Sequence, residues 1–327
     1  MVFFRTLYQI LKTRAGEIDF WIALALFTSL GFIFLPFTQW LVANTGDESR
    51  FFNTFIVVAF AAFLLVKSSA IPIQAPFALH AGAQKALLGA FLFITAGAFV
   101  RYSLDFSASG ISYNKILVFS ILTITAYCFS IAAFILFLFG PGFERLTTTV
   151  TSTLWTLLLL SLTMQPLDWP LRSAAAHVSV PPLDWLGKSV DMGILNEAGF
   201  APKLILLVDG HPFHVAAECN GFGLILSSVL LAILLSVFKR KYIPRALFNI
   251  LMAGGIGFLF NVLRIVIIVL LTPAYKEHYF LMHEIVGAIV FWGCLVLIWV
   301  LFGGPTHIGE QAIPETETET KGPTGRH

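Results

Sequence analysis

Three residues with reactive side chains, Cys219, Arg264 and His283, each lie where an apolar, membrane-length stretch approaches the same side of the bilayer. A cysteine thiolate is a nucleophile, an imidazole transfers protons near neutral pH, and a guanidinium stabilises negative charge. Ionisable residues at the edge of a transmembrane helix are energetically costly and are usually functional. Together the three predict a Cys/His nucleophilic site in which arginine supplies positive charge.

The segment around Cys219 reads Ala-Ala-Glu-Cys-Asn-Gly over 216–221 and leads directly into an apolar run. This position is at or just before a helix N-terminus, where unpaired N–H groups and the helix dipole favour a thiolate. Glu218 opposes that effect unless it turns away or pairs with a cation. The alternative for a single cysteine here is a small residue that caps the helix.

Arg264 interrupts the apolar stretch 258–271, which is otherwise broken only by Asn261. Asn261 lies one turn earlier on the same helix face. A buried guanidinium there could clamp a carboxylate or stabilise an oxyanion, whereas an arginine that extends to the membrane interface would need no such role. His283 alone is typical of an ordinary helix start, so the functional interpretation depends on the three residues together.

The composition indicates an integral membrane protein. Of 327 residues, 57% are hydrophobic and only 12% are charged, which leaves too little polar surface for a soluble globule. A net charge of +2 argues against a nucleic-acid partner. Cys128 and Cys294 lie within apolar segments, so no disulfide framework is expected.

A helix needs about 20 apolar residues to cross a bilayer. Lysine and arginine are commoner in the connections that are internal if the N-terminus is cytoplasmic, and Lys239-Arg240-Lys241 is the densest basic cluster. We therefore expect an all-α membrane protein of about eight spans with both termini cytoplasmic, and with Cys219, Arg264 and His283 on the outer side. The eight apolar runs are 21–43, 51–66, 86–100, 116–139, 147–164, 221–238, 246–272 and 282–303.

The chain divides into five expected regions. The long connection carries Asp209-Gly210 between two apolar stretches, which predicts a short hairpin because glycine accepts the positive φ of a tight turn. Residues 171–176 could form a short helix on the membrane surface. The regions are a cytoplasmic segment 1–20, five spans in 21–164, an extracytoplasmic loop 165–218, a three-span catalytic core 219–303 and a disordered cytoplasmic tail 304–327.

Glu218-Cys219-Asn220-Gly221 before one span, Asn261-Val-Leu-Arg264 in the next and His283 opening the last resemble the exosortase/archaeosortase family of membrane cysteine transpeptidases. The resemblance implies that Cys219 is the nucleophile, His283 the acid/base and Arg264 the stabiliser of substrate or oxyanion. Asn220, Gly221, Asn261 and Glu218 would support the site or the substrate. Asn220 in place of the commoner serine, together with Glu218, could mark a subfamily with a different substrate motif.

The resemblance also implies a substrate class. The enzyme would cleave exported proteins that carry a C-terminal sorting signal, made of a short motif, one transmembrane helix and a basic cluster. Water, or an amine of a surface lipid or glycan, would then resolve the thioester. The expected location is the cytoplasmic membrane of a prokaryote, with the site facing outward, in contact with membrane lipid and with no cofactor.

Two alternatives remain open at this point. His211, His214, His278 and His283, with Asp209, Glu218 and Glu284, could line an outer-face metal site of a hydrolase. A non-enzymatic transporter or assembly factor could instead use Arg264 as an intramembrane contact.

Overall fold

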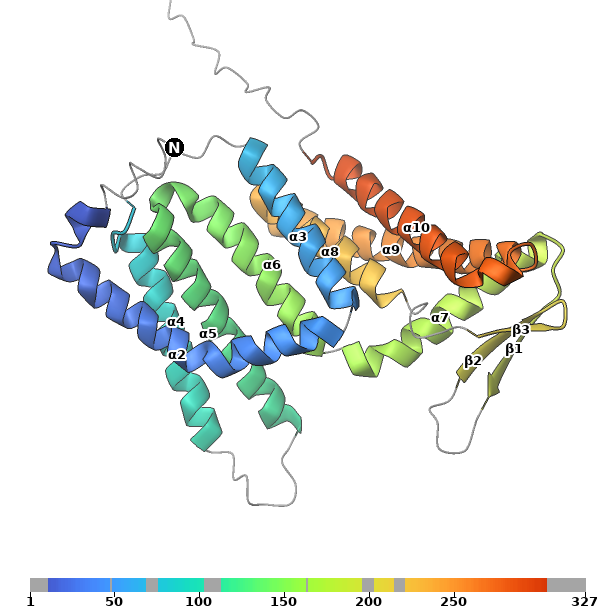
Figure 1. Cartoon of the computed structure of the whole chain (residues 1–327), viewed down its shortest axis with the longest axis horizontal. Coiled ribbons are helices and arrows are strands. Elements are labelled where there is room, and N and C mark those ends of the chain that lie inside the picture. Colours follow the sequence, from blue (N-terminus) through green and yellow to red (C-terminus); the bar gives the residue numbers. More distant parts are fainter. Residues whose placement is uncertain are drawn as a thin grey trace, which may run out of the picture.

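The computed structural model describes residues 11–47, 49–68, 76–102, 113–162, 164–195, 203–214 and 221–304. Its helices and strands follow one another along the chain as shown in Figure 1. They are α2 (Ile18–Asp47), α3 (Ser49–Ser68), α4 (Ala81–Tyr102), α5 (Tyr113–Phe139), η1 (Pro141–Phe143), α6 (Glu144–Leu162), α7 (Met164–Trp185), β1 (Val190–Leu195), β2 (Lys203–Val208), β3 (His211–His214), α8 (Phe222–Phe238), α9 (Ile243–Leu271), η3 (Lys276–His278) and α10 (Tyr279–Leu301).

Each of the eight apolar runs overlaps a helix, namely α2 to α6 and α8 to α10. Five of the helices in the described ranges are long and apolar enough to cross a membrane: Ile18–Gln39, Ala81–Tyr102, Ile116–Phe139, Ile243–Leu271 and Tyr279–Leu301. Two shorter apolar helices are Thr54–Ser68 and Phe222–Phe238. The protein is therefore mostly helical with several membrane-length helices, while the total of eight spans and their orientation stay predictions.

The N-terminal helices pack mainly through aromatic rings. Phe27 of α2 lies 5.1 Å from Phe137 of α5 between ring centroids, and Phe34 lies 5.4 Å from Tyr127. α4 runs beside α5 (Figure 1), where an added Cβ at Gly89 would lie 2.9 Å from the Phe129 ring. Offset and edge-on ring contacts of this kind add to the stabilisation that burial of the rings provides.

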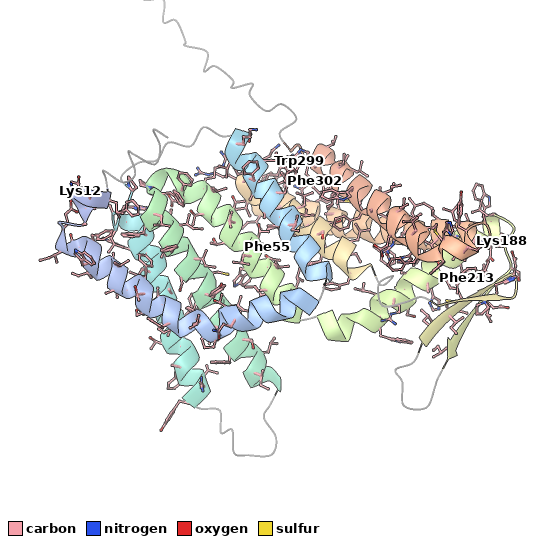
Figure 2. All side chains as sticks on the ribbon, in the orientation of Figure 1. Lys12, Phe55, Lys188, Phe213, Trp299 and Phe302 are labelled. Carbon is pink, nitrogen blue, oxygen red and sulfur yellow. The ribbon has the colours of Figure 1, made fainter. Side chains whose placement is uncertain are left out.

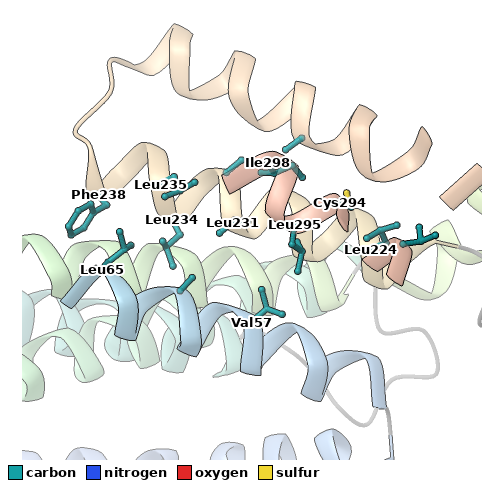
Figure 3. Close-up of a cluster of buried hydrophobic side chains, with 14 of the residues drawn as sticks. Val57, Leu65, Leu224, Leu231, Leu234, Leu235, Phe238, Cys294, Leu295 and Ile298 are labelled. Carbon is teal, nitrogen blue, oxygen red and sulfur yellow. The ribbon is translucent and has the colours of Figure 1, made fainter. Parts of the chain in front are cut away.

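The three C-terminal helices form a second unit around α8. This helix is apolar on all sides and is almost entirely buried, as expected for a helix surrounded by others. Figure 3 shows its leucines between α3, which contributes Val57 and Leu65, and α10, which contributes Leu295 and Ile298.

Small and hydroxyl residues bring α8 close to its neighbours. A Cβ on Gly257 of α9 would lie 2.9 Å from Ser228 Oγ and 3.1 Å from the Cα of Ile225. Thr54 of α3 and Ser227 share a buried hydrogen bond of 3.0 Å. Small residues let helix backbones approach in membranes, where van der Waals packing and polar contacts drive association.

The connection before α8 is more structured than a loop. The hairpin predicted at Asp209-Gly210 is confirmed: β2 pairs antiparallel with β3, and the two turn residues have φ of 51° and 77°. Both values are positive, as in the type I′ turns that suit strand twist. β1, which the sequence did not indicate, pairs with β2 and completes a three-stranded sheet.

Asp209 also holds the sheet to the end of α7. Its carboxylate accepts hydrogen bonds from Lys188 Nζ at 2.7 Å and from the Ser189 N–H at 3.0 Å. These two donors lower the pKa of Asp209 below its ordinary value. Lys188 is labelled beside the sheet in Figure 2.

α7 contains the helix expected at 171–176 but is much longer, and its place at the membrane surface stays a prediction. It runs from Met164 to Trp185 with Pro170, Pro181 and Pro182 inside it, and Ala175, Ala176 and Leu183 are fully buried. These residues pack with Leu206 and other residues of β2 against α9. α7 and the sheet therefore form a cap on one end of α9.

Candidate active site

The candidate residues gather at one end of the α8–α10 unit. Consecutive helices that pack together and are joined by short turns run in opposite directions. The start of α8, the last third of α9 and the start of α10 therefore lie at the same end. The predicted residues described at this end are Gly221, Asn261, Arg264 and His283.

Gly221 lies directly against Asn261. It precedes α8 with φ 73°, and a Cβ added to it would lie 2.4 Å from Asn261 Cγ and 2.5 Å from Asn261 Nδ2. Only glycine allows both this backbone conformation and this approach at low cost. Asn261 is fully buried, so its side chain fixes the position of the chain that enters α8.

Arg264 reaches α10, where it contacts His283 and Gly287. Its Nη2 lies 3.4 Å from His283 Nε2. A Cβ on Gly287 would lie 3.0 Å from Arg264 Nη2 and 3.3 Å from Cζ, so the guanidinium lies over this glycine. Arg264 is half-buried, which is consistent with a charge held at the edge of the helical bundle.

The hydrogen-bonding directions around His283 follow from this contact. A guanidinium can only donate, so His283 Nε2 is the acceptor in this contact, and a neutral ring carries its proton on Nδ1. Nδ1 faces Glu284 Oε1 at 3.8 Å, and the ring of Tyr279 lies 6.0 Å from the imidazole between centroids. The His283 side chain is 13% exposed and that of Glu284 is 62% exposed, so the imidazole is largely covered while the carboxylate beside it is at the surface.

The opposite side of α9 is held by the cap. Val262, Ile265 and Val269 are buried in a cluster with α7 and β2. Asn261 and Arg264 instead contact the start of α8 and the start of α10. The cap therefore fixes the rotation of α9 about its axis, which directs its two polar residues to the other helices.

The structure brings four of the predicted residues together in two pairs: Gly221 with Asn261, and Arg264 with His283. Glu218, Cys219 and Asn220 lie outside the described residues, so the contacts of the predicted nucleophile stay a prediction. Gly287 was missed. The signal for it was available, because Gly287 follows His283 by four residues and shares its helix face.

Among the described residues, those proposed for a metal site do not form a cluster. In the described ranges no three His, Cys, Asp or Glu side chains are placed to hold one ion. His211 and His278 are exposed, and Glu218 is not among the residues described.

The arrangement supports nucleophilic chemistry on a carbonyl. An imidazole that can accept and return a proton lies beside a cation that can stabilise an oxyanion, and Asn261, one turn before that cation, contacts Gly221. The cap and the bundle hold these groups on helices, which position side chains more firmly than loops do.

A match over most of the sequence shows the family to which the chain belongs. A family model described as "Transmembrane exosortase (Exosortase_EpsH)" matches residues 40–300, which include α3 to α10 and every predicted site residue. No curated protein and no solved structure matches the chain. Together with its apolar helices, the match identifies the chain as a multi-pass membrane protein that belongs to the transmembrane exosortase family.

Proposed function

We propose that the protein is a membrane-embedded cysteine transpeptidase or peptidase that cleaves the C-terminal sorting signal of exported proteins through a thioester on Cys219. The observation that carries this proposal is the 3.4 Å contact between Arg264 and His283, next to the Asn261–Gly221 contact. It supports the proposal because those residues belong to the three motifs that resemble the family's catalytic set.

The short stretch of chain between Cys219 and Gly221 also supports the proposal. Two residues of chain span at most about 7 Å, so Cys219 is tethered close to Gly221 and hence to Asn261. Arg264 is three residues beyond Asn261 on α9, a rise of about 4.5 Å. Cys219 is therefore confined to the end of the bundle at which Arg264 contacts the candidate base.

The proposed reaction follows from the roles of these groups. His283 Nε2 is the basic atom of the ring, so the Arg264 guanidinium leaves it for the developing oxyanion as Nε2 takes the thiol proton and Cys219 attacks the peptide carbonyl. The C–N bond then breaks, and His283 passes its proton to the leaving nitrogen. Water or an amine attacks the thioester, loses a proton to His283 and releases the Cys219 sulfur.

The orientation we propose places this site on the outer side of the cytoplasmic membrane of a prokaryote. The basic cluster 239–241 lies at the far end of α8 from Gly221, and clusters of this kind favour the cytoplasmic side. A substrate anchored by its own transmembrane helix would present a peptide bond at the depth of Arg264 and His283. We retain the expected eight spans and the catalytic core of 219–303 as part of this proposal.

The cysteines of the chain provide a matched test. We expect Cys219→Ala to abolish cleavage of a co-expressed reporter that ends in a sorting signal, measured as the processed fraction at equal enzyme level in the membrane. Cys128→Ala and Cys294→Ala serve as controls, since both thiols are buried in helices away from Arg264. They should leave cleavage within about twofold of wild type, and cleavage retained by Cys219→Ala would reject the assignment.

Thiol labelling separates this proposal from a non-enzymatic role. Cys128 and Cys294 are 5% and 0% exposed, so iodoacetamide should react first with Cys219 in the folded protein. An inert Cys219 would favour a transporter or assembly factor.

A further inference from the structure

A cavity of about 530 Å³ opens at the other end of the C-terminal unit, between the start of α9 and the end of α10. Its polar mouth is formed by Lys241, Tyr242 and Arg245, and its apolar wall includes Phe248, Met252 and Ile256. The residues of α9 that line the cavity, from Arg245 to Ile256, are spaced three or four positions apart. They therefore lie on one face of α9 over about 16 Å. Phe302, labelled in Figure 2, directly follows the last residue of α10 and lines the cavity there.

The mouth of this cavity concentrates positive charge. Four cations occur within 239–245, and this segment contains no acidic residue. Lys239 donates to the carbonyl of Gly303 and so joins this turn to the end of α10. None of the ion pairs found among the described residues involves Lys241 or Arg245.

Lys241 is the cation most affected by these surroundings. It is half-buried, and burial lowers its pKa, with further lowering from the charges of Lys239 and Arg245. An anion at the mouth would stabilise the charged form of Lys241 and so oppose the lowering of its pKa. The N-terminus of α9 adds to this preference, because its N–H groups carry partial positive charge.

The side chains around the mouth are typical of a membrane interface. Tyr242 is 65% exposed and Phe248 is 62% exposed, next to the cations. Amphipathic aromatic residues and basic residues gather at the level of lipid headgroups. A small soluble anion would use the mouth alone and would leave the apolar wall along α9 empty.

We propose that this cavity binds an anionic phospholipid from the leaflet opposite the candidate active site, with its phosphate between Lys241 and Arg245 and an acyl chain along the face of α9 that carries Met252 and Ile256. The lipid would join the start of α9 to the end of α10. Because α9 carries Asn261 and Arg264 further along, the bound lipid would stabilise the helices that form the catalytic site. The inference does not depend on the reaction proposed above.

The test measures how lipids stabilise the purified full-length protein in detergent. Phosphatidylglycerol should raise the unfolding temperature in a saturable way, from which an apparent Kd is obtained, and phosphatidylcholine should not. Lys241→Gln with Arg245→Gln should weaken this Kd by about 25-fold, since each cation near a lipid surface contributes about fivefold in affinity. The pair Lys241→Arg and Arg245→Lys should retain the response, which separates lost charge from misfolding.

A matched control removes two cations elsewhere. Lys12→Gln with Lys67→Gln lowers the net charge equally but leaves the cavity intact, and it should bind phosphatidylglycerol like wild type. Equal weakening in this control would show a bulk charge effect and would overturn the proposal. The same stabilisation by phosphatidylcholine, or by inorganic phosphate alone, would overturn it as well.

Acidic residues near the end of the chain allow one more test of the lipid proposal. Glu315, Glu317 and Glu319 could compete for the same cations. If phosphatidylglycerol stabilises only the full-length variant in which all three are changed to Gln, the tail occupies the cavity in the wild type and the lipid proposal is wrong. The expected result is an equal response with and without these charges.

Discussion

Helices α2 and α5 pack together largely through phenylalanine and tyrosine rings, whereas α8, α9 and α10 add to their apolar core three places where a glycine admits a polar side chain. In the first group the ring centroids of Phe27 and Phe137 are 5.1 Å apart, and several neighbouring rings make similar contacts. In the second group, an added Cβ at Gly221, Gly257 or Gly287 would lie within about 3 Å of Asn261, Ser228 or Arg264.

The difference indicates in which part of the molecule the relative positions of the helices are most restricted. An aromatic cluster can repack with small shifts of several rings, and the loss is spread over many weak contacts. A glycine in contact with a polar side chain fixes one backbone segment relative to one functional group. The C-terminal unit is therefore suited to position a site, and the aromatic helices are suited to support it.

The largest effect is expected for Gly221→Ala. Alanine would need the left-handed conformation at φ 73° and would also place its Cβ 2.4 Å from Asn261 Cγ. The chain that carries Cys219 would have to move by about 1 Å, which typically lowers the rate by about 100-fold. We expect this loss in the initial rate of reporter cleavage per enzyme molecule in the membrane.

Gly255→Ala is the matched control for this substitution. Gly255 lies inside α9 with no atom within 4 Å of an added Cβ. Alanine there should leave the rate within about twofold and stabilise the helix by about 0.5–1 kcal/mol. If Gly221→Ala cleaves at the wild-type rate, the contact with Asn261 does not position the nucleophile.

The sequence predicted the features that depend on local patterns. Apolar runs located eight of the nine described α-helices, and Asp209-Gly210 located the hairpin, because hydrophobic length and turn chemistry are local properties. The full length of α7 was not predicted, since its three prolines indicate helix ends, yet packing of Ala175, Ala176 and Leu183 on α9 maintains the helix. β1 was missed because its pairing partner β2 stabilises it through tertiary contacts.

For the candidate site too, local features were predicted from the sequence, whereas contacts between helices were not. Residue type and order indicated Arg264 and His283, and helix direction predicted that they lie at one end of the bundle. The approach of Gly221 to Asn261 and the placement of Arg264 over Gly287 depend on how the helices cross. Spacing along one helix does not specify that crossing.

Gly287→Ala should have an intermediate effect. Its Cβ would meet Arg264 Nη2 at 3.0 Å, so the guanidinium must shift away from His283 by a few tenths of an ångström. We expect the cleavage rate to fall by about tenfold, because electrostatic stabilisation by a single group depends on its placement. Steady-state kinetics should show the loss in kcat more than in KM.

Gly293→Ala on the same helix is the control. Its added Cβ would lie 3.9 Å from the Phe260 ring, an ordinary van der Waals contact, so the rate should not change. Equal losses in the two variants would indicate a general effect of alanine on α10, and would remove the special role of the Arg264–Gly287 contact.

The smallest effect on the rate is expected in the aromatic helices. Phe27→Ala removes a buried ring that packs on Phe134 and Phe137, and should lower the unfolding free energy by about 3 kcal/mol. Phe32→Ala, on the same helix but 72% exposed, should have little effect on stability. Cleavage per folded molecule should stay unchanged in both variants, because neither contacts α8, α9 or α10. A tenfold lower rate in folded Phe27→Ala would mean that the aromatic helices also position the site, so the two halves would not differ in the way their packing indicates.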